Sequence, residues 1–337
     1  MKVLVTIKEG TTRDSFLGKS ARELLASEFD VFYNDTGKEY TEEEIGHVLD
    51  RGFDIVLTGW GTPSLVGNEK KFRLLAHTGG SVGDLIVPSS FDAGIKAISA
   101  NSIYAVSTAE GALSYILSAL RCVPRETEKM KTAGYWKDGA EPFTRSLIGK
   151  TVGIVGVGAV ARALISFLLP FGVNLKLFDT YGIDPDYLRK TGAVQTSIED
   201  VFSTCDVISV HAALTEKTVR MIGEREFSLI RDGALFVNTS RGAIIDENAL
   251  AASLRSGRFY AFLDVYEREP LPAESELRRL DNVYLMPHKA GPASDLYPII
   301  GERIVEDMIR FRDGLPLEYE IKREEASRMT RHSSAMK

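Results

Sequence analysis

The chain has 337 residues, of which 44% are hydrophobic and 26% are charged, and its formal net charge is −6. A typical domain has roughly 100–200 residues, so this length predicts two domains, each able to bury a core without disulfides. The negative charge argues against nucleic acid or an anionic membrane as the main partner, although a local arginine can still bind an anion.

Cys122 and Cys205 lack CxxC spacing and indicate two free thiols in a reducing compartment. The apolar run at the N-terminus is too short for a signal peptide or a membrane span, and the chain has no run of 18 apolar residues. We therefore expect a cytoplasmic protein.

Short apolar runs alternate with amphipathic stretches in the first third of the chain. This alternation predicts an α/β domain whose parallel strands are joined by right-handed crossovers. The expected strands are 2–7, 31–33, 54–60 and 74–78, and the expected helix is 20–28.

A long helix is expected over 109–121, because Glu lies in its first turn and Arg in its last, as the helix dipole favours. A second alternation of strands and helices runs from Thr151 to about 290, and a final helix is expected near 296–312. The stretch 125–148 is polar and carries aromatic residues, and we interpret it as an arm or linker. Its distinctive residues are Tyr135, Trp136 and Pro142.

Residues 152–158 form an apolar strand that ends in a glycine-rich turn, VGIVGVG. The motif is GxGxxG with Ala in the third position, which a dinucleotide-binding turn permits. Gly156 would make the tight turn, and Gly158 would let the backbone approach a pyrophosphate. The amides of Ala159 and Val160, at the start of the next helix, would face its negative charge.

The next predicted strand, 175–179, ends in Asp179. This aspartate lies about 20 residues beyond the glycines, where a carboxylate binds the ribose 2′-hydroxyl and repels a 2′-phosphate. No arginine follows directly, since Thr180 and Tyr181 come next. The pattern predicts NAD rather than NADP as the cofactor.

Three further predicted strands each lead to a functional side chain. These segments are 236–242 with Arg241, 261–270 with Glu269, and 283–291 with His288. Because ligands bind beyond the carboxyl ends of parallel strands, the three side chains could converge there.

Hydride transfer to a 2-oxo acid needs these residue types. A guanidinium such as that of Arg241 binds a carboxylate bidentately and polarises the ketone oxygen. An imidazole such as His288 donates a proton to the developing alkoxide, and a carboxylate such as Glu269 favours and orients the imidazolium. No metal is expected.

Several blocks in this order and spacing resemble the signatures of the D-isomer-specific 2-hydroxyacid dehydrogenases. The resemblance is strong over roughly 100–295 and weaker over 1–99. The blocks are STAEGALSYIL (107–117), SVHAALTEKT (209–218), DGALFVNTS (232–240), NTSRGAIIDENAL (238–250), LDVYEREPLP (263–272) and MPHKAG (286–291).

The resemblance implies roles for individual residues. Arg241 would bind the substrate, Glu269 would be the partner of His288, and His288 would be the acid–base group. Asp264 matches the position that contacts the nicotinamide carboxamide. The loop whose backbone amides hold the substrate carboxylate would comprise Thr78, Gly79, Gly80 and Ser81.

The resemblance also implies two Rossmann-like, doubly wound parallel-sheet domains with the active site in the cleft between them. Residues 1–108 and 292–320 would form the substrate-binding domain, and 109–291 the NAD-binding domain. The helix and arm over 109–148 would mediate a homodimer, and 321–337 would be a flexible tail.

Four positions depart from the family pattern. Ala161 and Ala213 are mild replacements of Gly and Pro, and Gly111 replaces a frequent His without an evident reason. Lys289 replaces an apolar residue, and it is either an exposed charge or a contact to a second anionic group of the substrate.

Other functions remain open at this point. Transcriptional corepressors that bind NAD(H) resemble the same family, so the fold alone does not establish catalysis. Formate dehydrogenases have Gln where this chain has Glu269, which argues against that activity. The length argues against the extra regulatory domain of many phosphoglycerate dehydrogenases, so glyoxylate and hydroxypyruvate are the expected kind of substrate.

Overall fold

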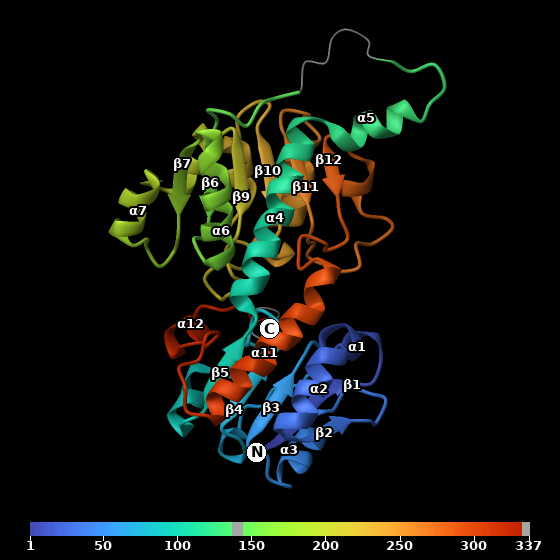
Figure 1. Ribbon diagram of the computed structural model, residues 1–337. Coiled ribbons are helices and arrows are strands. Elements are labelled where there is room, and N and C mark those ends of the chain that lie inside the picture. Colours follow the sequence, from blue (N-terminus) through green and yellow to red (C-terminus); the bar gives the residue numbers. More distant parts are fainter. Residues whose placement is uncertain (137–143, 332–337) are drawn as a thin grey trace. The chain divides into compact units, whose positions relative to one another are not determined.

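The computed structural model describes residues 1–136 and 144–331 (Figure 1). The chain divides into two compact units, each built around one sheet. Unit 1 comprises Met1–Ala105 and Pro292–Lys337, and unit 2 comprises Val106–Gly291. The chain passes from unit 1 to unit 2 inside helix α4, Asn101–Leu120.

Unit 1 contains a five-stranded sheet in the order β2-β1-β3-β4-β5, in which neighbouring strands are parallel. Its strands are rich in Val, Ile and Leu because a parallel sheet is covered on both faces. The strands are β1 (Lys2–Lys8), β2 (Asp30–Asn34), β3 (Ile55–Thr58), β4 (Leu74–His77) and β5 (Lys96–Ser99).

Helices cover both faces of this sheet. One face packs against α1, α2 and α11 through a core that includes Phe16, Leu25 and Ile304. The other packs against α3 and α12 through a core that includes Ile45 and Ala326. The helices are α1 (Thr11–Phe16), α2 (Lys19–Glu28), α3 (Glu42–Leu49), α11 (Tyr297–Arg312) and α12 (Arg323–Ser327).

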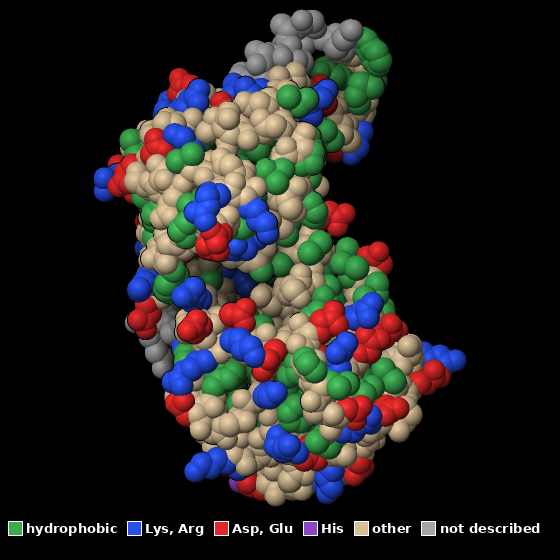
Figure 2. Space-filling view, turned by 60° about the vertical axis from the view of Figure 1, so that its left-hand side comes forward, with side chains coloured by type: hydrophobic (Ala, Val, Ile, Leu, Met, Phe, Trp, Pro, Cys, Tyr) green, Lys and Arg blue, Asp and Glu red, His purple; other side chains and the backbone are tan. Residues whose placement is uncertain are grey.

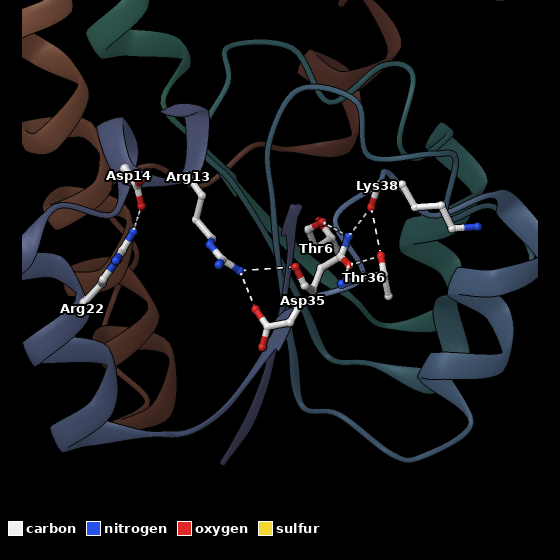
Figure 3. A network of polar contacts seen from close by, with 8 residues as sticks. Thr6, Arg13, Asp14, Arg22, Asp35, Thr36 and Lys38 are labelled. Carbon is white, nitrogen blue, oxygen red and sulfur yellow. Dashed lines mark hydrogen bonds and ion pairs between the residues drawn. The ribbon is translucent and has the colours of Figure 1, made fainter. Parts of the chain in front are cut away.

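A polar network fixes the loop after β2 in unit 1 (Figure 3). The buried Arg13 guanidinium donates to the Asp35 carboxylate at 3.0 Å. The Asn34 amide donates to the carbonyl of Thr6 at 3.1 Å and to that of Lys38 at 2.9 Å. These bonds satisfy polar groups that would be costly to bury alone, and they hold the loop against β1.

Unit 2 contains a seven-stranded parallel sheet in the order β12-β11-β10-β9-β6-β7-β8. The strand order reverses between β6 and β9, which is the position where doubly wound sheets bind ligands. The strands are β6 (Thr151–Val155), β7 (Asn174–Phe178), β8 (Val194–Gln195), β9 (Val207–Val210), β10 (Leu235–Asn238), β11 (Tyr260–Leu263) and β12 (Val283–Leu285).

The sheet of unit 2 is also covered on both faces. The core on one face joins α4 and α6 to the strands, and it includes Ile116, Leu164 and Phe262. On the other face, Phe202, Phe227 and Phe236 pack edge to face or tilted. The remaining helices are α5 (Val123–Met130), α6 (Ala159–Leu168), α7 (Pro185–Thr191), α8 (Ile198–Thr204), α9 (Glu224–Leu229) and α10 (Glu247–Leu254).

Helix α4 is long and apolar enough, by length and composition alone, to cross a membrane. Its side chains instead contribute to the core of unit 2, where Ala109, Ala112 and Ile116 are fully buried. Burial against a sheet accounts for this apolar character.

Most of the expected elements lie where the sequence places them, but two segments differ. Helix α4 begins at Asn101 rather than at 109. Residues expected in the tail form α12, because Ile321 and Ala326 bury their side chains in unit 1. Pro142 of the expected arm and residues 332–337 of the expected tail lie outside the described residues.

The face drawn in Figure 2 carries Lys and Arg side chains interspersed with Asp and Glu. Charges of both signs therefore alternate over this face.

Candidate active site

Glu269 and His288 form a hydrogen-bonded pair in unit 2. The Glu269 Oε2 atom lies 2.8 Å from His288 Nδ1. The other carboxylate oxygen, Oε1, accepts the amide of Tyr266 at 3.1 Å, which fixes the carboxylate in its loop. Both side chains remain partly exposed, at 46% for His288 and 37% for Glu269, so a ligand can reach them.

The electrostatics of the pair favour an ionised Glu269. Partial burial raises the pKa of Glu269, but the hydrogen bonds from His288 and the Tyr266 amide and the charges of His288 and Arg241 outweigh it, and the net pKa is lowered. Arg241 therefore lies close enough to act on this carboxylate. The structure thus brings Arg241, Glu269 and His288 together within unit 2.

The backbone at His288 is held in an unusual conformation. Its φ is +54°, in the left-handed region that non-glycine residues rarely adopt outside constrained sites. Three successive amides of this turn bond to Asp264. The His288 amide donates to the Asp264 carbonyl at 2.9 Å, and those of Lys289 and Ala290 donate to its carboxylate at 2.7 and 2.8 Å.

Asp264 therefore has a structural role that the sequence did not reveal. It is completely buried, and its carboxylate also accepts the Tyr115 hydroxyl at 3.2 Å. Its proposed contact with the nicotinamide carboxamide stays a prediction. The residues that hold Asp264 were missed because they are distant in sequence.

Two glycines permit close packing around the site. A Cβ on Gly242 would overlap the peptide that joins Tyr266 to Glu267, so this glycine lets the Arg241 loop lie against the Glu269 loop. A Cβ on Gly111 would overlap the carbonyl of Ala290. This contact explains the departure at Gly111, because α4 lies directly against the segment after His288.

A cavity of about 530 Å³ adjoins the Glu269–His288 pair. Most of its lining is apolar. Arg278, which also lines it, donates to the carbonyls of Leu271 and Pro272 at 2.8 and 2.9 Å and braces that loop. The lining residues are Tyr266, Glu269, Pro270, Leu271, Arg278, Leu285, Met286, Pro287 and His288.

The glycine-rich turn has the geometry that a dinucleotide requires. Gly156 has a φ of +88°, and a Cβ there would overlap the backbone of Ala212. A Cβ on Gly158 would meet nothing within 4 Å, so the helix start is open to a ligand. The first amides of α6, from Ala159 and Val160, have no partner inside the helix.

Asp179 lies at the end of β7 beside this turn. Its carboxylate accepts the amide of Val157 at 2.7 Å and that of Tyr181 at 2.8 Å. These bonds orient the side chain toward the turn, and each oxygen retains a further lone pair for a hydroxyl. The residues present therefore fit a bound nicotinamide dinucleotide.

The predicted substrate loop lies in unit 1 after β4. Thr78 is buried and its hydroxyl donates to the Thr58 carbonyl at 3.2 Å, whereas the Ser81 hydroxyl donates to the Thr330 carbonyl at 2.9 Å. Within the described residues, the amides of Gly79, Gly80 and Ser81 donate to no protein acceptor. These amides, rather than the hydroxyls, are available to an anion.

Groups of three or more potential metal ligands do not occur in the part of the chain that the structure describes.

Comparison with known proteins assigns the family. Residues 113–290 match the NAD binding domain of the D-isomer specific 2-hydroxyacid dehydrogenases. The chain belongs to this family. A glyoxylate reductase from Korarchaeum cryptofilum is 30% identical, over 72% of this chain and 74% of the relative. A hydroxypyruvate reductase from Thermotoga maritima is 31% identical, over 74% of this chain and 80% of the relative.

Other D-2-hydroxyacid dehydrogenase relatives are longer. The chain spans about half the length of the D-3-phosphoglycerate dehydrogenases that it matches, 47% for that of Archaeoglobus fulgidus. A solved structure from Pyrococcus horikoshii has a TM-score of 0.80 at 24% identity, covering 95% of this chain and 94% of that one. That likeness supports the two-sheet fold predicted for this family member.

Proposed function

We propose that this family member interconverts a D-2-hydroxy acid and a 2-oxo acid with NAD as cofactor. The observation that carries the proposal is the hydrogen bond of 2.8 Å between Glu269 Oε2 and His288 Nδ1, with the charge of Arg241 acting on the same carboxylate. His288 can supply a proton, Glu269 can orient the imidazole that carries it, and Arg241 adds a positive charge that can bind a substrate carboxylate.

In the reductive direction, protonated His288 donates a proton to the substrate oxygen from Nε2, because Nδ1 faces Glu269. Glu269 stabilises the imidazolium and fixes the ring orientation. Arg241 binds the substrate carboxylate and stabilises charge on the reacting oxygen. In the oxidative direction, neutral His288 accepts the proton from the hydroxyl.

The cofactor would be held by the turn after β6. The amides of Ala159 and Val160 would face the pyrophosphate, Gly156 and Gly158 would allow its approach, and Asp179 would bind the adenosine ribose. When bound, the nicotinamide supplies or accepts the hydride. The free amides of Gly79, Gly80 and Ser81 are candidates for a second anchor of the substrate carboxylate.

The expected substrates are small 2-oxo acids such as glyoxylate and hydroxypyruvate. NADH oxidation should be measured with these acids, pyruvate, 4-methyl-2-oxopentanoate and 3-phosphohydroxypyruvate. We expect turnover of at least one, and His288→Ala should lower its kcat by roughly 10²–10⁴, the range for general acid catalysis. Bound NADH without turnover of any 2-oxo acid would instead favour a regulatory protein of the corepressor type.

Asp179 is the basis for proposing NAD rather than NADP. Its carboxylate can bind the ribose diol and would repel a 2′-phosphate, so NADH should be used at least about tenfold better than NADPH. Asp179→Ala should narrow that difference. Equal kcat/KM for the two cofactors in the unmodified protein would refute the assignment.

We also propose a homodimer formed through the helix and arm of 109–148. Large apolar side chains are exposed in this region, which is typical of an interface. They are Val123, Met130, Trp136 and Ile148. Light scattering should give twice the mass of one chain, and a monomer at micromolar concentration would contradict this proposal.

A further inference from the structure

We infer that Tyr115 is a positioning residue for His288, acting through the carboxylate of Asp264. Tyr115 lies on α4, far along the chain from the three catalytic side chains. This inference rests on the proposed function, because it assigns a role in the proton transfer of that reaction.

The hydroxyl of Tyr115 is directed at Asp264 by aromatic packing. Its ring stacks on Phe262 of β11, with centroids 4.4 Å apart and an interplanar angle of 9°. The hydroxyl then lies 3.2 Å from Asp264 Oδ1. Burial and the nearby Asp264 charge raise the pKa of Tyr115, so the hydroxyl remains a donor.

Asp264 needs this donor because its carboxylate has no solvent contact. A buried carboxylate is stable only when its oxygens accept enough hydrogen bonds. Its protein donors in the described chain are the Lys289 amide, the Ala290 amide and the Tyr115 hydroxyl. Tyr115 is the one side-chain donor of the set, and it comes from outside the turn that Asp264 holds.

The two amide donors belong to the turn at His288. His288 has a positive φ, which is unfavourable for a non-glycine residue, so the geometry of the turn depends on the hydrogen bonds that hold it. The position of the imidazole relative to Glu269 follows from this backbone. Loss of the Tyr115 hydroxyl would therefore loosen the turn and misplace the proton donor.

Helix α4 contacts the same turn at a second point. The backbone at Gly111 lies directly against the carbonyl of Ala290, where a Cβ would not fit. Gly111 and Tyr115 are one helical turn apart and lie on the same face of α4. This face of the helix thus supports the segment that follows His288.

The test compares Tyr115→Phe with Tyr284→Phe. Both residues are buried, and both rings pack against Phe262, Tyr284 at 5.6 Å, but only the Tyr115 hydroxyl bonds to Asp264 among the described contacts. Amide hydrogen exchange at Lys289 and Ala290, measured without substrate, should become about fivefold faster in Tyr115→Phe only. Equal exchange in the two variants would overturn the inference.

Kinetics give the second arm of the test. Tyr115→Phe should lower kcat about three- to tenfold and leave the KM for NADH within about twofold. In an Asp264→Asn background the same change should have no further effect, whereas additive losses would show that Tyr115 does not act through Asp264. Absence of any 2-oxo acid turnover in the unmodified protein would refute the proposed function, and the exchange result would still decide the role of Tyr115.

Discussion

Single side chains in the site differ in what they contribute, and substitution should separate them. His288 carries the proton, and Glu269 stabilises the imidazolium form of His288. Arg241 is a permanent cation, and its charge lowers the pKa of Glu269. The cation is proposed to contact the substrate before and during the reaction, whereas the ion pair acts on the proton.

Arg241→Lys should therefore raise KM for the 2-oxo acid and lower kcat together, each by roughly tenfold. The substitution keeps a positive charge but loses the planar fork that binds a carboxylate through two bonds. Steady-state kinetics with the best substrate of the panel measure both constants. Arg231→Lys, at a half-exposed position in the same unit, is the control and should change neither. A change in KM alone would mean that Arg241 does not act on the reacting oxygen.

For single residues, the sequence predicted which side chains carry the chemistry better than it predicted the contacts that hold them. Residue type and position after a strand were sufficient to propose Arg241, Glu269 and His288. The bonds of Asp264 to Tyr115 and to the turn at Lys289 were not predictable, because they join residues far apart in sequence. The departure at Gly111 was visible in the sequence, but its reason needed the position of Ala290.

Among the elements, the turn between β10 and α10 leaves no room for a side chain at Gly242. Gly242 directly follows Arg241, and the Tyr266–Glu267 peptide occupies the space where a side chain would begin. A side chain there would separate the loop of Arg241 from the loop of Glu269.

Gly242→Ala should lower kcat/KM by roughly tenfold or more. The added methyl group would force the two loops apart, and backbone shifts of this kind cost about 1–3 kcal/mol. Gly223→Ala is the matched control, since its Cβ would meet only Glu226 Oε2 at 3.9 Å. Activity and thermal unfolding should both be measured for each variant. Equal activity in the two variants would show that the contact between the loops is not needed.

The strands were the most predictable elements, because fully buried parallel strands are continuous apolar runs. The start of α4 was placed too late because Asn101–Tyr104 carries no strong helix signal of its own. Tertiary packing overrides that weak preference, since Ala105 and Ala109 are buried. Helix α12 was missed for a related reason, because two buried side chains, Ile321 and Ala326, order a segment that is otherwise polar.

For the whole molecule, two buried histidines should make stability depend on pH. Burial lowers the pKa of His77 and that of His211 to about 4. Each is hydrogen-bonded by a hydroxyl, from Thr58 and Ser209 respectively. The unfolded chain takes up these protons near pH 6.5, whereas the folded protein does so only near pH 4.

The contribution of these neutral histidines to the free energy of unfolding is thus complete above about pH 6.5, and it decreases as the pH falls toward 4. At pH 5 the free energy of unfolding should be lower by about 2 kcal/mol for each histidine than at pH 7.5. Urea unfolding of His211→Gln should show a weaker pH dependence than the unmodified protein. The exposed His47→Gln serves as the control. An unchanged slope in His211→Gln would contradict the prediction.

The central claim is that Glu269 and His288 act as one proton-transferring unit. Since the pKa of Glu269 is lowered, its carboxylate is charged throughout the neutral range and favours the imidazolium that reduction requires. Glu269→Gln keeps the shape and removes the charge. The most direct test is the pH–rate profile of 2-oxo acid reduction for the unmodified protein and this variant. The account predicts that the falling alkaline limb shifts to lower pH, by roughly one unit or more, because less His288 remains protonated. An alkaline limb that stays in place would show that Glu269 is not the partner of the proton donor.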